Sequence, residues 1–189
     1  VAQDDLRDQP AAAFKSAVER LQNAGAAIDW IDVPEVEEAL GLATCVFTSE
    51  AYGTWREVIE ANPEDMYLEI LQRFRLGKQF SGPDYVAAWA KLEQARMAWD
   101  QATAGFDGVL SPSCPILPPN LARLEQEEDY YVQANLLTLR NTRIGNLMGT
   151  CGLSVPTGTA SCGLQILGQP NCEEALLRVG IGVEAALAG

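Results

Sequence analysis

Histidine is absent from the 189 residues of this chain, and its absence excludes several chemistries at once. The chain can hold no Ser-His-Asp or Cys-His catalytic group, no histidine-ligated zinc and no histidine general base. Its five cysteines are an odd number without a Cys-x-x-Cys pair, which is typical of free thiols in a reducing compartment. We therefore expect no metal ion or organic cofactor at a dedicated site, because scattered carboxylates hold only weakly bound, hydrated cations.

Positive charge and long apolar runs are also scarce. The 13 basic residues are outnumbered by 26 acidic ones, and a surface with a formal net charge of -13 repels phosphate backbones. No apolar run approaches the roughly 20 residues of a membrane-spanning helix, and the N-terminus shows no signal-peptide pattern. These absences predict a soluble protein that binds neither nucleic acid nor membrane, with the cytoplasm as its default location.

What is present suffices for one folded α/β domain, since 48% of the residues are hydrophobic. The spacing of apolar residues predicts helices over 10–24, over most of 34–103, over 127–149 and near the C-terminus. Short β-rich runs bounded by Gly and Pro predict four strands, at 28–33, 107–111, 153–156 and 163–167. No repeat or Gly-Ser linker is present, so we expect no domain boundary inside the chain.

The residues by themselves indicate no complete active site. A proline-dense loop follows the second predicted strand, and loops at strand ends are where α/β sheets place binding residues. Cys114 lies in this loop, but no histidine is available to lower the pKa of its thiol. Ser154 and Ser161 have no visible base. The remaining cysteines near the C-terminus stand beside Gly or Asn, and we expect small buried side chains at Cys151, Cys162 and Cys172.

Six segments resemble, in the same order, those of the amidase-signature family. The run Thr142–Gly149 with Leu153–Gly158 is similar to the family's Thr, its Asn-Leu-x-Gly turn and its strand ending Val-Pro-x-Gly. Gly163–Gly168 resembles its Gly-x-Gln-hydrophobic-hydrophobic-Gly strand, and Phe106–Pro112 resembles its Phe-Asp … Ser-Pro-Thr strand and loop. The other matching segments are the helix from Glu173 to Glu184, the run Arg73–Gly77 and the run Ala11–Gly25.

The resemblance implies an α/β fold with a mixed central sheet flanked by helices. Residues 1–189 would be the C-terminal portion of a single amidase domain, and the start at Val1 rather than Met fits a partial chain. The family hydrolyses amides with a Ser-Ser-Lys triad, in which a second serine in a cis peptide activates the nucleophile and the lysine is the base. That triad belongs to a Gly- and Ser-rich region of the N-terminal half. We therefore assign no catalytic residue here, not even Lys15, Lys78 or Lys91.

The resemblance also implies that the 112–119 loop and the 138–146 segment face the substrate. The expected pocket residues are Cys114, Ile116, Leu117, Arg140 and Thr142. A structural role for Thr142 and Asn146, in holding the turn before the next strand, is an open alternative. Arg140 lies near the position where glutamine-using amidotransferases carry an acid, and it favours a carboxylate-bearing or electron-rich substrate.

The leading hypothesis is hydrolysis of a small carboxamide by the full-length enzyme. In it, this chain supplies pocket walls, and its partner is the N-terminal half of the same enzyme. The chain alone is expected to be inactive and to form homo-oligomers. The alternative is a catalytically silent, amidase-like scaffold or binding subunit of a complex.

Overall fold

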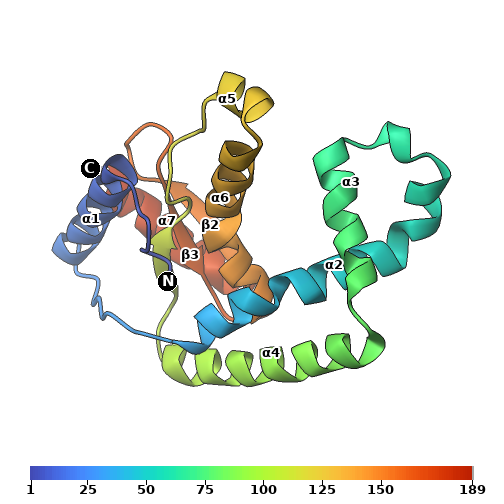
Figure 1. Cartoon of the computed structure of the whole chain (residues 1–189). Coiled ribbons are helices and arrows are strands. Elements are labelled where there is room, and N and C mark those ends of the chain that lie inside the picture. The colour runs from blue at the N-terminus through green and yellow to red at the C-terminus, as the bar shows by residue number, and fades with distance from the viewer. Residues whose placement is uncertain (189) are drawn as a thin grey trace. The chain divides into compact units, whose positions relative to one another are not determined.

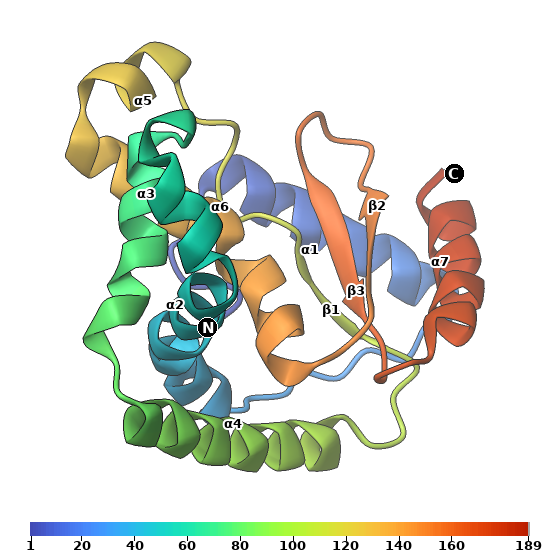
Figure 2. The same cartoon turned by 90° about the vertical axis from the view of Figure 1, so that its right-hand side faces the viewer.

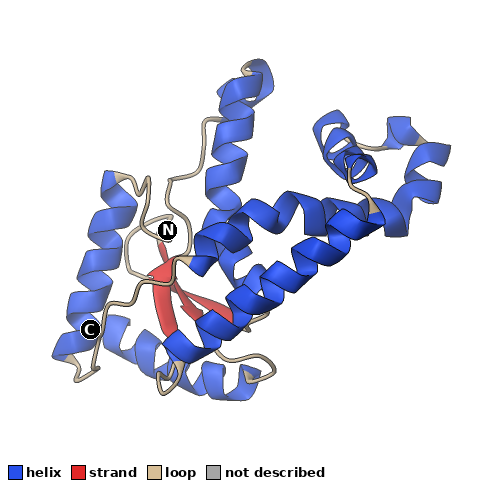
Figure 3. Ribbon diagram, turned by 60° about the horizontal axis from the view of Figure 1, so that its bottom comes forward, coloured by secondary structure: helices blue, strands red, loops and turns tan. Residues whose placement is uncertain are grey.

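The computed structural model describes residues 1–188, which form two compact units. One unit combines residues 1–32 with residues from 100 onward, and the other spans residues 33–99. Helices dominate both units, and the strands all lie in the first (Figure 3). No helix among residues 1–188 has the length and hydropathy needed to cross a bilayer. The organisation as a single domain stays a prediction.

The first unit is built on a three-stranded sheet with the strand order β1–β3–β2. Its strands are β1 (Val109–Pro112), β2 (Gly152–Pro156) and β3 (Gly163–Leu167) (Figure 2). The central strand β3 pairs antiparallel with both neighbours, and Leu167 faces Val109 on one side and Gly152 on the other. Within residues 1–188, β1 and β2 are therefore each paired on one side only.

One face of this sheet is apolar because the strands alternate in polarity. Leu110, Ile166 and Leu153 form one cross-strand row on that face. Helices α1 (Asp8–Asn23) and α7 (Glu173–Ala188) pack against it, and Figure 2 shows α7 beside β2. Their buried side chains and those of the strands form one core, made of Phe14, Ala17, Val18, Leu21, Val155, Leu164, Ile166, Leu176, Val183 and Leu187.

Helix α6 (Glu128–Met148) packs against the opposite face of the sheet. A Cβ placed on Gly145 of this helix would lie 2.9 Å from Leu167 Cδ2 and 3.7 Å from Gln165 Nε2, so the helix backbone approaches β3 closely. The helix ends at Gly149, whose left-handed φ of 71° favours glycine. A short helix, α5 (Leu121–Gln126), precedes α6 and is capped by the Asn120 side chain.

The strand predicted over residues 28–33 is not formed. This segment runs as a loop between α1 and the next helix (Figure 1), and Trp30 is 66% exposed. A β-rich run becomes a strand only when a neighbour takes up its backbone hydrogen bonds, and the three observed strands pair with one another. The other three predicted strands are present, β1 shifted toward the C-terminus. The prediction that Cys172 is buried is also wrong, because it lies in the exposed turn before α7.

The α/β class predicted from the sequence is confirmed. The resemblance implies a mixed sheet, whereas both pairings among residues 1–188 are antiparallel. The predicted first helix is confirmed as α1, which ends before Gly25 at a φ of 98°. The predicted helices over 127–149 and near the C-terminus are confirmed as α6 and α7.

The second unit is helical, as predicted. Its elements are α2 (Glu35–Ala61), the short 3-10 helix η1 (Pro63–Asp65), α3 (Leu68–Arg75), the 3-10 helix η2 (Leu76–Gln79) and most of α4 (Gly82–Thr103) (Figure 1). Helix α4 begins with a reciprocal cap: Ser81 N donates to Asp84 Oδ2 at 2.9 Å, and Asp84 N donates to Ser81 Oγ at 3.2 Å.

A carboxylate near the end of α2 joins this helix to the segment that follows it. Glu60 accepts hydrogen bonds from Arg75 Nη2 at 2.6 Å and Nε at 3.0 Å, and Lys78 Nζ lies 3.0 Å away. The hydrogen bonds from Arg75, and then from Lys78, lower the pKa of Glu60 to about 2. The carboxylate therefore stays ionised in the folded protein across the physiological pH range.

Candidate functional site

Three polar side chains form a row across the sheet, on the face opposite the apolar core. Ser111, Gln165 and Ser154 come from β1, β3 and β2 and lie in register; we call them the polar row. Ser113, one residue past β1, extends toward it and places its Oγ 2.6 Å from Ser154 Oγ. These two hydroxyls meet because Gly163 has no side chain: a Cβ there would lie 2.7 and 2.8 Å from the two oxygens.

Asn141 of α6 joins the helix to the end of β1. This asparagine is fully buried, and its Nδ2 donates to Pro112 O at 2.7 Å and to Ala2 O at 2.9 Å. Its main-chain oxygen accepts from Gln165 Nε2 at 3.5 Å. The Gln165 Oε1 atom is buried and has no partner among the described residues. Buried polar atoms are normally paired, and this oxygen departs from that rule.

Replacing Asn141 with alanine is expected to lower the free energy of unfolding by about 2 kcal/mol. The substitution leaves the Pro112 carbonyl without its buried donor and opens a small cavity. Urea unfolding followed by circular dichroism measures the loss. Asn146→Ala is the control on the same helix, because Asn146 is exposed and its replacement should change stability by no more than about 0.5 kcal/mol. Equal losses in the two variants would contradict the role given to Asn141.

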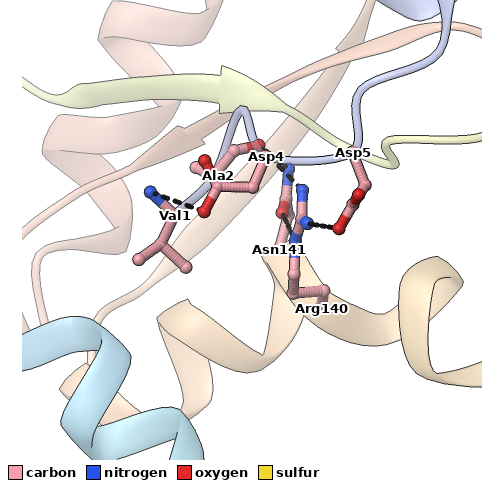
Figure 4. Close-up of polar contacts among 6 residues, drawn as sticks. All are labelled: Val1, Ala2, Asp4, Asp5, Arg140 and Asn141. Carbon is pink, nitrogen blue, oxygen red and sulfur yellow. Dashed lines mark hydrogen bonds and ion pairs between the residues drawn. The ribbon is translucent and has the colours of Figure 1, made fainter.

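Arg140 is held by the N-terminal residues (Figure 4). Its side chain is 13% exposed, and Nη1 lies 3.6 Å from Asp5 Oδ2 while Nη2 donates to Ala2 O at 3.4 Å. Its Nε donates to the Oδ1 atom of Asn141 at 3.2 Å. Burial lowers the pKa of Arg140, and the charges of Asp4, Asp5 and Cys114 act in the opposite direction. The guanidinium is therefore a half-buried cation that already has a carboxylate beside it.

The other predicted site residues divide between two places. Cys114, Ile116 and Leu117 are half-buried in the loop after β1, and Arg7 N anchors this loop by donating to Pro115 O at 2.9 Å. The charge of Cys114 acts to raise the pKa of Arg140, which indicates that these two predicted residues lie near each other. Thr142, by contrast, is exposed, and its Oγ1 donates to Leu139 O of the same helix at 3.1 Å. A pocket role for these residues stays a prediction.

The sequence by itself indicates no role for Asn141 or for the polar row. Asn141 could have been found, since it precedes Ile144 and Met148 by three and seven residues and so stands on the apolar stripe of its helix. An amide at such a position needs buried partners. The contact between Ser113 and Ser154 had no such signal, because it depends on the register of three strands.

The described residues hold no group of three or more Cys, Asp or Glu side chains that could bind a metal ion. Lys15 is exposed and lies 3.9 Å from Glu19, and Lys78 pairs with Glu60. These two lysines therefore take part in surface ion pairs. That this chain contains no catalytic residue, and that it uses no cofactor, stay predictions.

The sequence of this chain is similar to those of known amidases and amidotransferase subunits. The family model described as Amidase matches residues 2–177. The chain is 32% identical over 194 residues to the 2-amino-5-chloromuconic acid deaminase of Comamonas testosteroni, covering 97% of this chain and 41% of that protein. It is 28% identical over 208 residues to a glutamyl-tRNA(Gln) amidotransferase subunit of Halobacterium salinarum, covering 96% of this chain and 48% of that protein.

Solved structures give the same fold. The Kluyveromyces lactis allophanate hydrolase superposes with a TM-score of 0.83 at 20% sequence identity, over 96% of this chain and 29% of that one. The chain thus spans less than half the length of the curated relatives named above.

Proposed function

This chain belongs to the amidase family, and we propose that it is the C-terminal portion of an enzyme that hydrolyses the C–N bond of a small carboxamide. The observation that carries the proposal is the family match over residues 2–177. In this proposal the chain supplies one wall of the substrate pocket, formed by the loop after β1 and the adjoining part of α6. Cys114, Ile116, Leu117, Arg140 and Thr142 set the shape and polarity of that wall.

The catalytic groups, in this proposal, lie in the part of the protein outside residues 1–189. The greater length of the relatives supports this, as does the absence of histidine from the chain. A serine attacks the amide carbon, and a lysine takes its proton through the second serine of the triad. The amine leaves, and water then hydrolyses the acyl-enzyme. The outer edges of β1 and β2 have no pairing strand in the part of the chain that the structure describes, which is consistent with a sheet that the remaining part of the protein completes.

Arg140 points to the substrate class. A guanidinium binds a carboxylate through charge-assisted hydrogen bonds, which are stronger than neutral ones. In the structure the Arg140 guanidinium lies beside Asp5, whose side chain is 68% exposed. Because Asp5 is exposed, a substrate carboxylate can replace the Asp5 carboxylate beside Arg140. The Comamonas testosteroni relative is named for an acid, which agrees with this choice. We therefore propose an amide substrate that carries a carboxylate.

The test compares two amides in the enzyme that contains this chain: succinamic acid, which has a carboxylate, and butanamide, which is neutral. Arg140→Gln should lower kcat/KM for succinamic acid about 10-fold or more and change it for butanamide by about 2-fold at most, as expected for loss of a charged hydrogen bond. Arg178→Gln is the control, because Arg178 is an exposed arginine of α7 paired with Glu174. Equal losses on both amides would contradict the carboxylate role, and hydrolysis of neither amide by the unaltered enzyme would count against a small-carboxamide hydrolase.

The second candidate is a catalytically silent subunit of a complex. Its membership of a complex is supported by one observation: the Halobacterium salinarum relative is named as a subunit. The sequence that precedes Val1 in the complete protein distinguishes the two candidates. A lysine followed by a Gly- and Ser-rich loop with two serines is the result expected for the enzyme, and a preceding segment without them supports the silent subunit.

A further inference from the structure

The pairing of β1 with β3 continues past the end of β1. Val109 faces Leu167 and Pro112 faces Leu164, and Ser113 N then donates to Gly163 O at 2.9 Å. The next two residues in this register are Cys114 and Cys162. These two cysteines are 48 positions apart in the sequence, and the same register, continued by one residue beyond Ser113 and Gly163, would set them opposite each other.

This position suits a cross-strand disulfide. Hydrogen-bonded and non-hydrogen-bonded pairs alternate along an antiparallel ladder. Because a hydrogen bond joins Ser113 to Gly163, a pair formed by the next residues, Cys114 and Cys162, would be of the non-hydrogen-bonded kind. The Cα atoms of such pairs are about 4.5 Å apart, which lies within the roughly 4.4–6.8 Å that disulfides span. Strand alternation, continued by these residues, would direct the two side chains to the same face of the sheet.

The chemical state of the two cysteines is consistent with such a pair. Both are free thiols and both are half-buried. The backbone of Cys162 is held by three hydrogen bonds: its oxygen accepts from Thr157 Oγ1 at 2.8 Å and from Thr157 N at 3.3 Å, and its own N donates to Thr159 O at 3.1 Å. Burial, and then the charge of Cys114, raise the pKa of the Cys162 thiol.

We propose that Cys114 and Cys162 form a thiol–disulfide site that closes reversibly by exchange with a low-molecular-weight disulfide such as glutathione disulfide. The Cys114 thiolate attacks one sulfur of glutathione disulfide, forms a mixed disulfide and releases one glutathione thiolate. Cys162 then loses its S–H proton to solvent, and its sulfur attacks the Cys114 sulfur and releases the second glutathione. The protein gives up two thiol protons and two electrons, and the glutathione disulfide is reduced to two glutathione molecules.

The order of attack follows from the surroundings of the two thiols. The raised pKa of Cys162 makes it the poorer initial nucleophile, since only the thiolate attacks. Once closed, the bond ties the loop after β1 to the turn between β2 and β3. Its effect on a substrate pocket depends on the function proposed above, whereas formation of the bond does not.

The test uses the variant Cys45→Ser/Cys151→Ser/Cys172→Ser, which retains only the two proposed partners. After incubation with glutathione disulfide, we expect it to lose both free thiols and the mass of two hydrogen atoms. Trypsin should then release peptides 97–123 and 144–178 as one linked species that dithiothreitol separates. Adding Cys162→Ser should leave a stable glutathione adduct on Cys114, because no resolving thiol remains.

The unaltered protein provides a second measurement that does not depend on the folding of the variant. Fragmentation of its linked peptides should identify Cys162, rather than Cys151 or Cys172, as the partner of Cys114. A bond from Cys114 to either of those residues would overturn the proposal. So would a lasting glutathione adduct on Cys114 when Cys162 is present, or two thiols that stay free. None of these readouts uses amide hydrolysis, so the outcome is independent of the proposed activity.

Discussion

Gly77→Ala is expected to lower the free energy of unfolding of the helical unit by about 3 kcal/mol or more, although it adds only one methyl group. A Cβ on Gly77 would fall on the main-chain oxygen of Thr48 and lie 2.8 Å from both Thr48 C and Tyr52 Cβ. The obstacle is the backbone of α2, which cannot rotate out of the way as a flexible side chain could. Either α2 and η2 separate, or the backbone of η2 changes its course.

Gly53→Ala is the matched control for this substitution. Gly53 lies in the same helix α2, and apart from the adjacent residues and nearby backbone of that helix no atom lies within 4 Å of the Cβ that alanine would add there. Because alanine is the better helix former, this variant should be as stable as the unaltered protein or up to about 1 kcal/mol more stable. Urea unfolding of the two variants measures the difference, and similar midpoints would show that the close approach of η2 to α2 does not exist in solution.

The helices and two of the strands could be predicted because their signals are local. Helix α1 combines an apolar stripe with a terminating Gly25, and β2 and β3 are short apolar runs bounded by Gly and Pro. The residues 28–33 carry the same kind of signal and still form a loop. A strand also depends on a partner elsewhere in the chain, and local sequence does not reveal that partner.

The candidate site could be predicted only in part, for a related reason. The proline-dense loop is visible in the sequence, and the resemblance to a family predicts Arg140 as a pocket residue. The residues that hold Arg140 in place were not visible, because Ala2 is 138 positions away in the chain. The contact of Ser113 with Ser154 across Gly163 likewise follows from strand register, which hydrophobic patterning alone leaves open here.

The largest effect on function is expected when the chain 1–189 is assayed without the rest of the protein. Acyl transfer at neutral pH needs an activated nucleophile, a base within about 3 Å of it and donors for the oxyanion. Our proposal places all three outside this chain. The isolated chain should also self-associate, since the outer edges of β1 and β2 have no pairing strand within residues 1–188 and Trp55 and Val58 of α2 are exposed.

Ammonia release from a panel of small carboxamides is the measurement that most directly tests whether this chain shapes a pocket without holding the catalytic groups. The purified chain 1–189 should release no ammonia above background, and co-expression with the remaining part of the protein should give turnover. Cys114→Ala in the co-expressed protein should alter KM without abolishing hydrolysis. Sustained turnover by the purified chain alone, retained after Cys114→Ala, would show that the catalytic groups lie within residues 1–189.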